Sequence, residues 1–71
     1  MLEEEYNQLH SKYGSYVDVA LRREVKVGMP LELLLISWGE PEKINRSSHG
    51  DQYVYGHQYV YVEGKTVTAW N

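Results

Sequence analysis

The stretch "GMPLELLLISWGEP", residues 28–41, decides the fold, because it frames one apolar run with Gly and Pro at each end. Pro30 has no N–H and a fixed φ, which suits the first turn of a helix. Gly39 supplies the left-handed residue that commonly ends a helix, and Pro41 keeps the preceding residue out of helical conformation. Apolar residues recur between them at helical spacing, namely Leu31, Leu34, Leu35 and Trp38. The stretch therefore predicts a short helix over residues 30–38 that is covered on more than one side.

The residues before this helix also follow a helical period. Apolar and aromatic side chains recur at every third or fourth position (Leu2, Tyr6, Leu9 and Tyr13), which indicates one buried face. Gly14 is a typical helix stop, and Ser15 can cap a second helix that begins directly after it. Residues 2–13 and 15–24 therefore form either two helices or one kinked helix.

The second half of the chain changes to a twofold period. Residues 52–55, 59–62 and 66–70 are β-branched and aromatic with alternating polarity, and Gly-containing turns separate them. Residues 42–47 are compatible with a further short edge strand. The pattern predicts a single α+β domain over residues 1–71, with a two-layer α-α-β-β-β arrangement in which helices pack on one face of a three-stranded antiparallel meander.

The last hairpin predicts which side chains face the helices. If Glu63-Gly64 forms a two-residue loop, directly paired residues share a face. The aliphatic face is the better core, because buried Tyr and Thr hydroxyls each require a partner. It carries Val60, Val62, Val67 and Ala69. We therefore expect an uncovered aromatic face that binds a protein through His57, Tyr59, Tyr61, Thr66, Thr68 and Trp70.

The faces of the strand at residues 52–55 depend on the length of the loop that follows it. A three-residue loop (residues 56–58) places Tyr53 and Tyr55 on the aromatic face and Val54 in the core. A two-residue loop reverses them, since one step of register exchanges the faces of a strand. The residues alone leave both registers open.

Four features together resemble the SmpA/OmlA (BamE-like) outer-membrane lipoprotein domain. They are the Gly28-Met29 step, the helix that ends at Gly39 to Pro41, the aromatic strand from Tyr53 to Tyr55, and the hairpin that Gly64 closes. The chain is similar to the wider α-α-β-β-β superfamily that includes the β-lactamase-inhibitor protein. The resemblance covers residues 24–71, and residues 1–13 form an additional N-terminal helix.

This resemblance implies a bacterial, non-catalytic scaffold that binds other proteins, in some members through the sheet face. It also favours Tyr53 and Tyr55 as at least partly buried residues. It implies a location in the cell envelope or periplasm if a targeting segment has been removed, and otherwise the protein is expected in the cytoplasm. The lipoprotein members carry a signal peptide and an acylated Cys, and because this sequence has no cysteine we do not expect membrane anchoring or insertion.

Composition limits the other functional classes. The 71 residues contain no cysteine, which removes disulfides, thiolate chemistry and the common zinc sites. The formal net charge of −3 argues against nucleic-acid binding, which requires clustered cations on phosphates. His10, His49 and His57 match no ligand spacing, and no phosphate or dinucleotide motif is present. We therefore expect no metal, no cofactor and no catalytic residue.

Two alternatives to binding of another protein stay open. The aromatic face can be the contact of a self-associating homodimer, because Tyr and Trp suit half-wet surfaces of either kind. The polar segment with Ser47, Ser48, His49 and Asp51 contains the residue types of a hydrolytic triad, but neighbours in one loop rarely reach the geometry that a triad requires. A non-catalytic interaction module is the leading hypothesis, self-association the second and a hydrolase the third.

Overall fold

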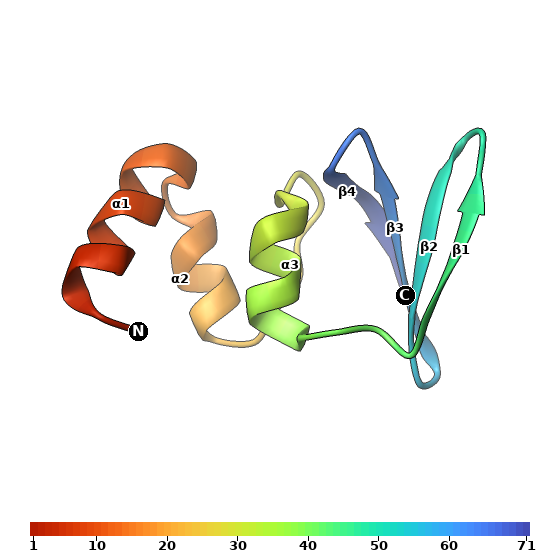
Figure 1. Ribbon diagram of the computed structural model, residues 1–71, viewed down its shortest axis with the longest axis horizontal. Helices are drawn as coiled ribbons and strands as arrows, with labels where there is room; N and C mark the ends of the chain where they lie inside the picture. Colours follow the sequence, from red (N-terminus) through yellow and green to blue (C-terminus); the bar gives the residue numbers. More distant parts are fainter.

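The computed structural model describes residues 1–71 and shows an α+β chain in which all helices precede all strands (Figure 1). The helices are α1 (Glu3–Tyr13), α2 (Tyr16–Leu21) and α3 (Leu31–Trp38). The strands are β1 (Lys43–Ser47), β2 (Gly50–Tyr55), β3 (Gln58–Glu63) and β4 (Thr66–Trp70). The α+β class predicted from the sequence is confirmed.

The sheet is an antiparallel meander of four strands in the order β1-β2-β3-β4, where the sequence predicted three. The additional strand is β1, which pairs along its whole length with β2, from Lys43 opposite Val54 to Ser47 opposite Gly50. It corresponds to the segment that was compatible with an edge strand. Ile44 is the only residue of β1 that packs against the core, so the sequence of β1 has little of the apolar alternation that predicts a strand.

The helices form a row that leads away from the sheet, with α3 beside the strands, α2 behind α3 and α1 outermost (Figure 1). All three therefore lie on one side of the sheet, as expected, but α1 packs on α2 rather than on the strands. Gly14, whose φ of 65° and ψ of −143° lie outside the helical region, separates α1 from α2, so the two are separate helices.

The ends of α1 and α3 lie at the predicted positions or one residue away from them. Gly39 ends α3 with φ of 78°, as predicted. Pro30 is the residue before the first turn and has extended backbone, so α3 begins at Leu31 rather than at Pro30. Leu2 likewise precedes α1, and its side chain is 70% exposed instead of buried in the predicted stripe.

The core joins α2, the loop before α3, α3 itself and the inner side of the sheet. The largest fully buried side chains are Met29, Leu33, Leu34, Val17, Val60 and Val67. Val62 is buried with them, so three of the four predicted core positions of the last hairpin are confirmed. The fourth, Ala69, is exposed.

Segment Gly28–Leu31 covers the first part of the free edge of β4. The Val67 N–H donates to the Met29 carbonyl at 2.8 Å, and the Gly28 N–H donates to the Val67 carbonyl at 2.8 Å. The Leu31 N–H donates to the Lys65 carbonyl at 2.9 Å. These bonds pair an otherwise open edge and attach the start of α3 to the sheet.

Candidate functional site

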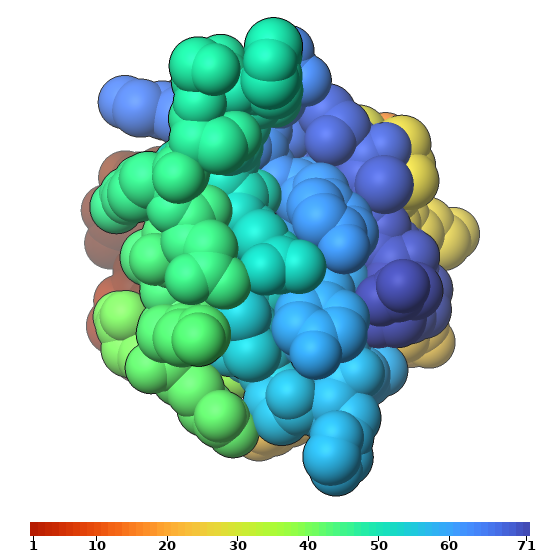
Figure 2. Space-filling view, turned by 90° about the vertical axis from the view of Figure 1, so that its right-hand side faces the viewer, coloured from red at the N-terminus to blue at the C-terminus, as the bar shows by residue number.

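The side of the sheet that faces away from the helices is uncovered, and Figure 2 looks directly onto it. We call it the outer face. The pairing of the strands arranges its side chains in three rows that run from β1 to β4. The rows are Lys43-Val54-Tyr59-Asn71, Asn45-Gln52-Tyr61-Ala69 and Ser47-Gly50-Glu63-Thr66, with Thr68 as an extra residue beside Ala69.

Aromatic and uncharged residues occupy the centre of the outer face. Tyr61 is 37% exposed, and Tyr59 lies half-buried in the neighbouring row of β3. Val54 is only 7% exposed although no helix covers it, because Lys43 and Tyr59 flank it in the same row. Lys43 and Glu63 are the charged side chains of the rows, and they lie in the two outer rows, on β1 and β3. Aromatic residues with few charges at the centre are typical of protein interfaces.

Side-chain hydrogen bonds join all four strands near the middle row. The Asn45 amide donates to Gln52 Oε1 at 2.8 Å, and the Gln52 amide donates to the Tyr61 hydroxyl oxygen at 3.3 Å. The Thr68 hydroxyl donates to the Tyr61 carbonyl at 3.3 Å. Tyr61 Oη therefore still has its own proton to donate. Asn45 and Gln52 are not among the predicted binding residues, since their role depends on β1 being a strand.

A hollow of about 350 Å³ interrupts the outer face above Gly50. Asn45, Gln52, Tyr61 and Thr68 are among the residues that line it. Gly50 has φ of 124°, and a Cβ atom there would lie 3.0 Å from the Val62 carbonyl oxygen, so a side chain is disfavoured and the hollow stays open. The hollow can accept a protruding side chain between an aromatic ring, side-chain amides and the Arg46–Asp51 ion pair, which also lines it.

Two of the six predicted binding residues lie elsewhere. His57 is exposed in the turn between β2 and β3, because that loop has two residues and ends before Gln58. The same two-residue loop buries Tyr53 and half-buries Tyr55, which the resemblance favoured. Trp70 lies on the helix side of the sheet. Tyr59, Tyr61, Thr66 and Thr68 are on the outer face as predicted.

A β-bulge moves Trp70 to the helix side. The register between β3 and β4 changes between Tyr61 and Val62, so that Thr68 is an extra residue and Trp70 pairs with the inward-facing Val60. The turn itself is Gly64-Lys65 rather than Glu63-Gly64, with φ of 58° and 63°, as a type I′ turn requires. Moving the turn by one residue keeps the faces of both strands, and only the bulge exchanges them.

Trp70 contacts an aromatic cluster at the end of α3. Its ring lies edge-on to Trp38 at a centroid distance of 6.0 Å, and Trp38 lies edge-on to Tyr55 at 5.3 Å. The Trp38 N–H donates to the Arg23 carbonyl at 2.9 Å, and the Tyr55 hydroxyl donates to the Gly39 carbonyl at 2.9 Å. The cluster fastens α3 to the sheet. We interpret it as structural, because the Trp38 N–H and the Tyr55 hydroxyl are both bonded within the protein.

Burial raises the pKa of Tyr55 to about 12, and the nearby Tyr53 and Glu40 add to this effect. At neutral pH the phenol is uncharged in both the folded and the unfolded chain. Above the ordinary tyrosine pKa of about 10, the unfolded chain ionises first, which favours unfolding. We expect stability to fall as the pH rises through the interval between these values. Urea titrations at alkaline pH, with Tyr55→Phe as the control that flattens the decline, measure this, and an unchanged decline in Tyr55→Phe contradicts it.

The Ser and His residues near the β1–β2 turn hold that turn together. The Ser47 hydroxyl donates to the Gly50 carbonyl at 2.7 Å and accepts the backbone N–H of His49 at 3.1 Å. The Asp51 carboxylate binds Arg46 at 2.8 Å. The Ser47 hydroxyl and the Asp51 carboxylate are therefore engaged with other partners, and no hydrogen bond joins the His49 imidazole to either of them.

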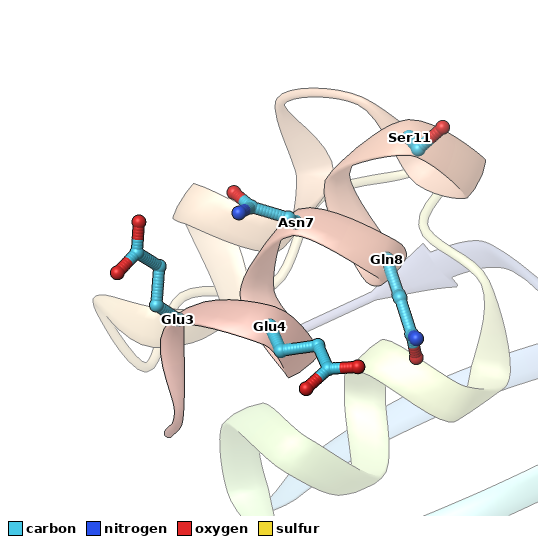
Figure 3. Close-up of a pocket in the computed structure, with 5 residues that line it drawn as sticks. All are labelled: Glu3, Glu4, Asn7, Gln8 and Ser11. Atoms are coloured by element: carbon cyan, nitrogen blue, oxygen red, sulfur yellow. The ribbon is translucent and has the colours of Figure 1, made fainter.

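The other surfaces have fewer features of a binding or catalytic site. A concavity of about 710 Å³ is lined by five polar residues that all belong to α1, drawn in Figure 3. His10 lies on α1, whereas His49 and His57 lie in turns at opposite ends of the sheet. No group of three or more His, Cys, Asp or Glu side chains is arranged to hold a metal ion. The outer face is thus the strongest candidate site.

Comparisons with known proteins add no relative. None of the helices is both long and apolar enough to cross a membrane. No family model matches the chain, and no curated protein or solved structure matches it. The resemblance to the SmpA/OmlA domain therefore stays a prediction from the residues.

Proposed function

We propose that this protein is a small non-catalytic interaction module that binds a protein partner on the outer face of its sheet. The observation that carries the proposal is the pair Tyr59 and Tyr61 on a sheet face that no helix covers. Tyrosine supplies a large contact area and a polar tip at low entropic cost, which makes it a frequent anchor of interfaces. The hollow above Gly50 beside Tyr61 offers a place for one protruding partner side chain.

The size of the face sets the expected strength of binding. Four strands about 4.8 Å apart and five residues of about 3.4 Å each span roughly 19 Å by 17 Å. A stable interface buries about 800 Å² on each partner, which is more than this area provides. The complex is therefore expected to be transient unless the partner also contacts the hairpin turns.

The resemblance to the SmpA/OmlA domain supports the same proposal, since it implies a bacterial scaffold that binds proteins. Self-association through the same face is the second hypothesis, and the experiment below separates the two.

Photo-crosslinking tests the proposal. Tyr61 is replaced by the photoreactive residue benzoylphenylalanine in the cell that makes the protein, and Val27, which is 58% exposed on the loop before α3, carries the same residue as the control. We expect an adduct of fixed mass from position 61 and none from position 27. A Tyr59→Ala change in the position-61 protein should weaken that adduct roughly tenfold or more, as for an interface anchor.

The mass of the adduct identifies the partner class. A mass equal to two copies of the chain supports the self-association hypothesis and contradicts a different partner. Equal labelling at positions 61 and 27, or no adduct at position 61, contradicts the use of the outer face altogether.

A further inference from the structure

A second surface lies on the helix side of the sheet, where α1 ends and α3 begins. A groove of about 490 Å³ is lined there by Pro30, Leu31 and Leu35, with Lys12 and Lys65 on its rim. The two leucines are only half-buried, so part of each side chain is open to the groove. Glu32 also lines it but is held by the Tyr13 hydroxyl. The groove is thus apolar inside and offers two cations outside.

Neither lysine forms a salt bridge within the protein, although Tyr13 and, to a smaller extent, the Glu32 carboxylate raise the pKa of Lys12. The ion pairs of the protein join His10 to Asp18, Arg22 to Glu24 and Arg46 to Asp51, and none includes Lys12 or Lys65. Lys12 instead lies over the Tyr13 ring, with Nζ 5.1 Å from the ring centroid. A ligand for this groove should therefore combine apolar side chains with carboxylates.

One segment of the chain itself has this composition. Met1 and Leu2 are 57% and 70% exposed, and Glu3, Glu4 and Glu5 follow them without any ion pair. This segment cannot enter the groove of its own molecule. It lies at the opposite end of α1 from Lys12, and an 11-residue helix separates the two by about 16 Å (Figure 1).

We infer that the groove binds residues Met1–Glu5 of a second copy, and that two copies pair through antiparallel α1 helices. In this arrangement each molecule places Met1 and Leu2 in the groove of the other, and the Glu3–Glu5 carboxylates meet Lys12 and Lys65. A twofold axis makes the two contacts identical. The opposed helix dipoles add a favourable term, since the acidic start of each α1 meets the end of the other.

The exposed side of α1 suits the middle of such a pair. Figure 3 shows Asn7 and Gln8 between Glu3 and Ser11 on this helix. Halfway along two antiparallel helices these amides meet their own counterparts, and an amide can both donate and accept a hydrogen bond. No residue of α1 is fully buried within one molecule, so the helix retains surface for this contact.

A charge exchange tests the inference. Variant A carries Glu3→Lys, Glu4→Lys and Glu5→Lys, and variant B carries Lys12→Glu and Lys65→Glu. The wild-type protein is expected to shift from monomer to dimer in sedimentation velocity between about 10 µM and 1 mM, and less so at high salt. Variants A and B are each expected to stay monomeric, because like charges then face each other. An equimolar mixture of A and B is expected to form the dimer again.

A further variant separates binding from the stability of α1. Leu2 precedes the first turn and makes no capping hydrogen bond, so Leu2→Ser removes the apolar anchor while it adds a favourable cap. We expect this variant to keep its helix content and to weaken dimerisation at least tenfold. Ile36→Ser, at an exposed apolar position of α3 that does not line the groove, is the matched control and should dimerise as the wild type does.

Several outcomes overturn the inference. A wild-type protein that stays monomeric over the whole concentration range excludes the pair. A mixture of A and B that stays monomeric excludes the charge contacts. A dimer that survives in A, B and Leu2→Ser but is lost in Tyr61→Lys places self-association on the outer face instead.

Discussion

Leu34→Ala is expected to lower the free energy of unfolding by about 3 kcal/mol, because Leu34 is completely buried between α3 and its neighbours. The loss combines the transfer of the removed atoms with the cavity that remains. A domain of this size has a total stability of roughly 4 to 10 kcal/mol, so the variant should lose about a third to three quarters of it. Urea titration followed by tryptophan fluorescence measures the effect.

Ile36→Ala is the control for this prediction. It lies on the same helix but is 41% exposed, so the same kind of truncation should cost less than about 1 kcal/mol. Equal losses in the two variants would mean that the helix does not present Leu34 to the core.

Gly28→Ala is expected to lower the free energy of unfolding by about 2 to 3 kcal/mol. Gly28 has φ of 94°, which L-residues rarely adopt, and a Cβ atom there would clash with the Tyr16 hydroxyl oxygen. Tyr16 would have to move and lose its 3.2 Å hydrogen bond to the Val27 carbonyl. The Gly28 N–H would also be drawn away from Val67, which weakens the cover of the β4 edge.

A double-mutant cycle separates the steric part of this effect from the backbone part. Tyr16→Phe removes the hydroxyl that meets the new methyl group, so it should recover part of the loss when it is combined with Gly28→Ala. Gly64→Ala has a positive φ of 58° but open space around the added Cβ, and it should cost about 1 kcal/mol. A Gly28→Ala variant no less stable than Gly64→Ala would contradict the close approach of Tyr16.

Residues 28–41 show which features of the fold follow from local sequence preferences. The helix and its end at Gly39 follow from the spacing of apolar residues and from backbone preferences, both of which act within one segment. The most buried side of the helix differs from the predicted one. Leu33, Leu34 and Ser37 are buried, whereas Leu31 and Leu35 are half-buried. Ser37 is tolerated because its hydroxyl donates to the Glu24 carbonyl at 2.8 Å, a partner from another segment.

The candidate site also combines residues that the local sequence pattern predicts with residues that only strand pairing places there. The uncovered outer face with Tyr59 and Tyr61 could be predicted, because alternation along β3 places valines and tyrosines on opposite sides. Asn45 and Gln52 could not, since their position depends on pairing with β1, whose sequence has little strand character. His57 was misplaced because the length of its loop sets the register, and the residues allowed two lengths.

The sequence by itself determined the order of helices and strands, the helix stops at Gly14 and Gly39, and the inward valines of the last hairpin, because these depend on neighbours within a few residues. Only the tertiary structure decided the side of Trp70. A bulge at Thr68 turns Trp70 toward Trp38 and exposes Ala69, which places the larger apolar surface against α3. That balance involves residues from both halves of the chain, so no local pattern contains it.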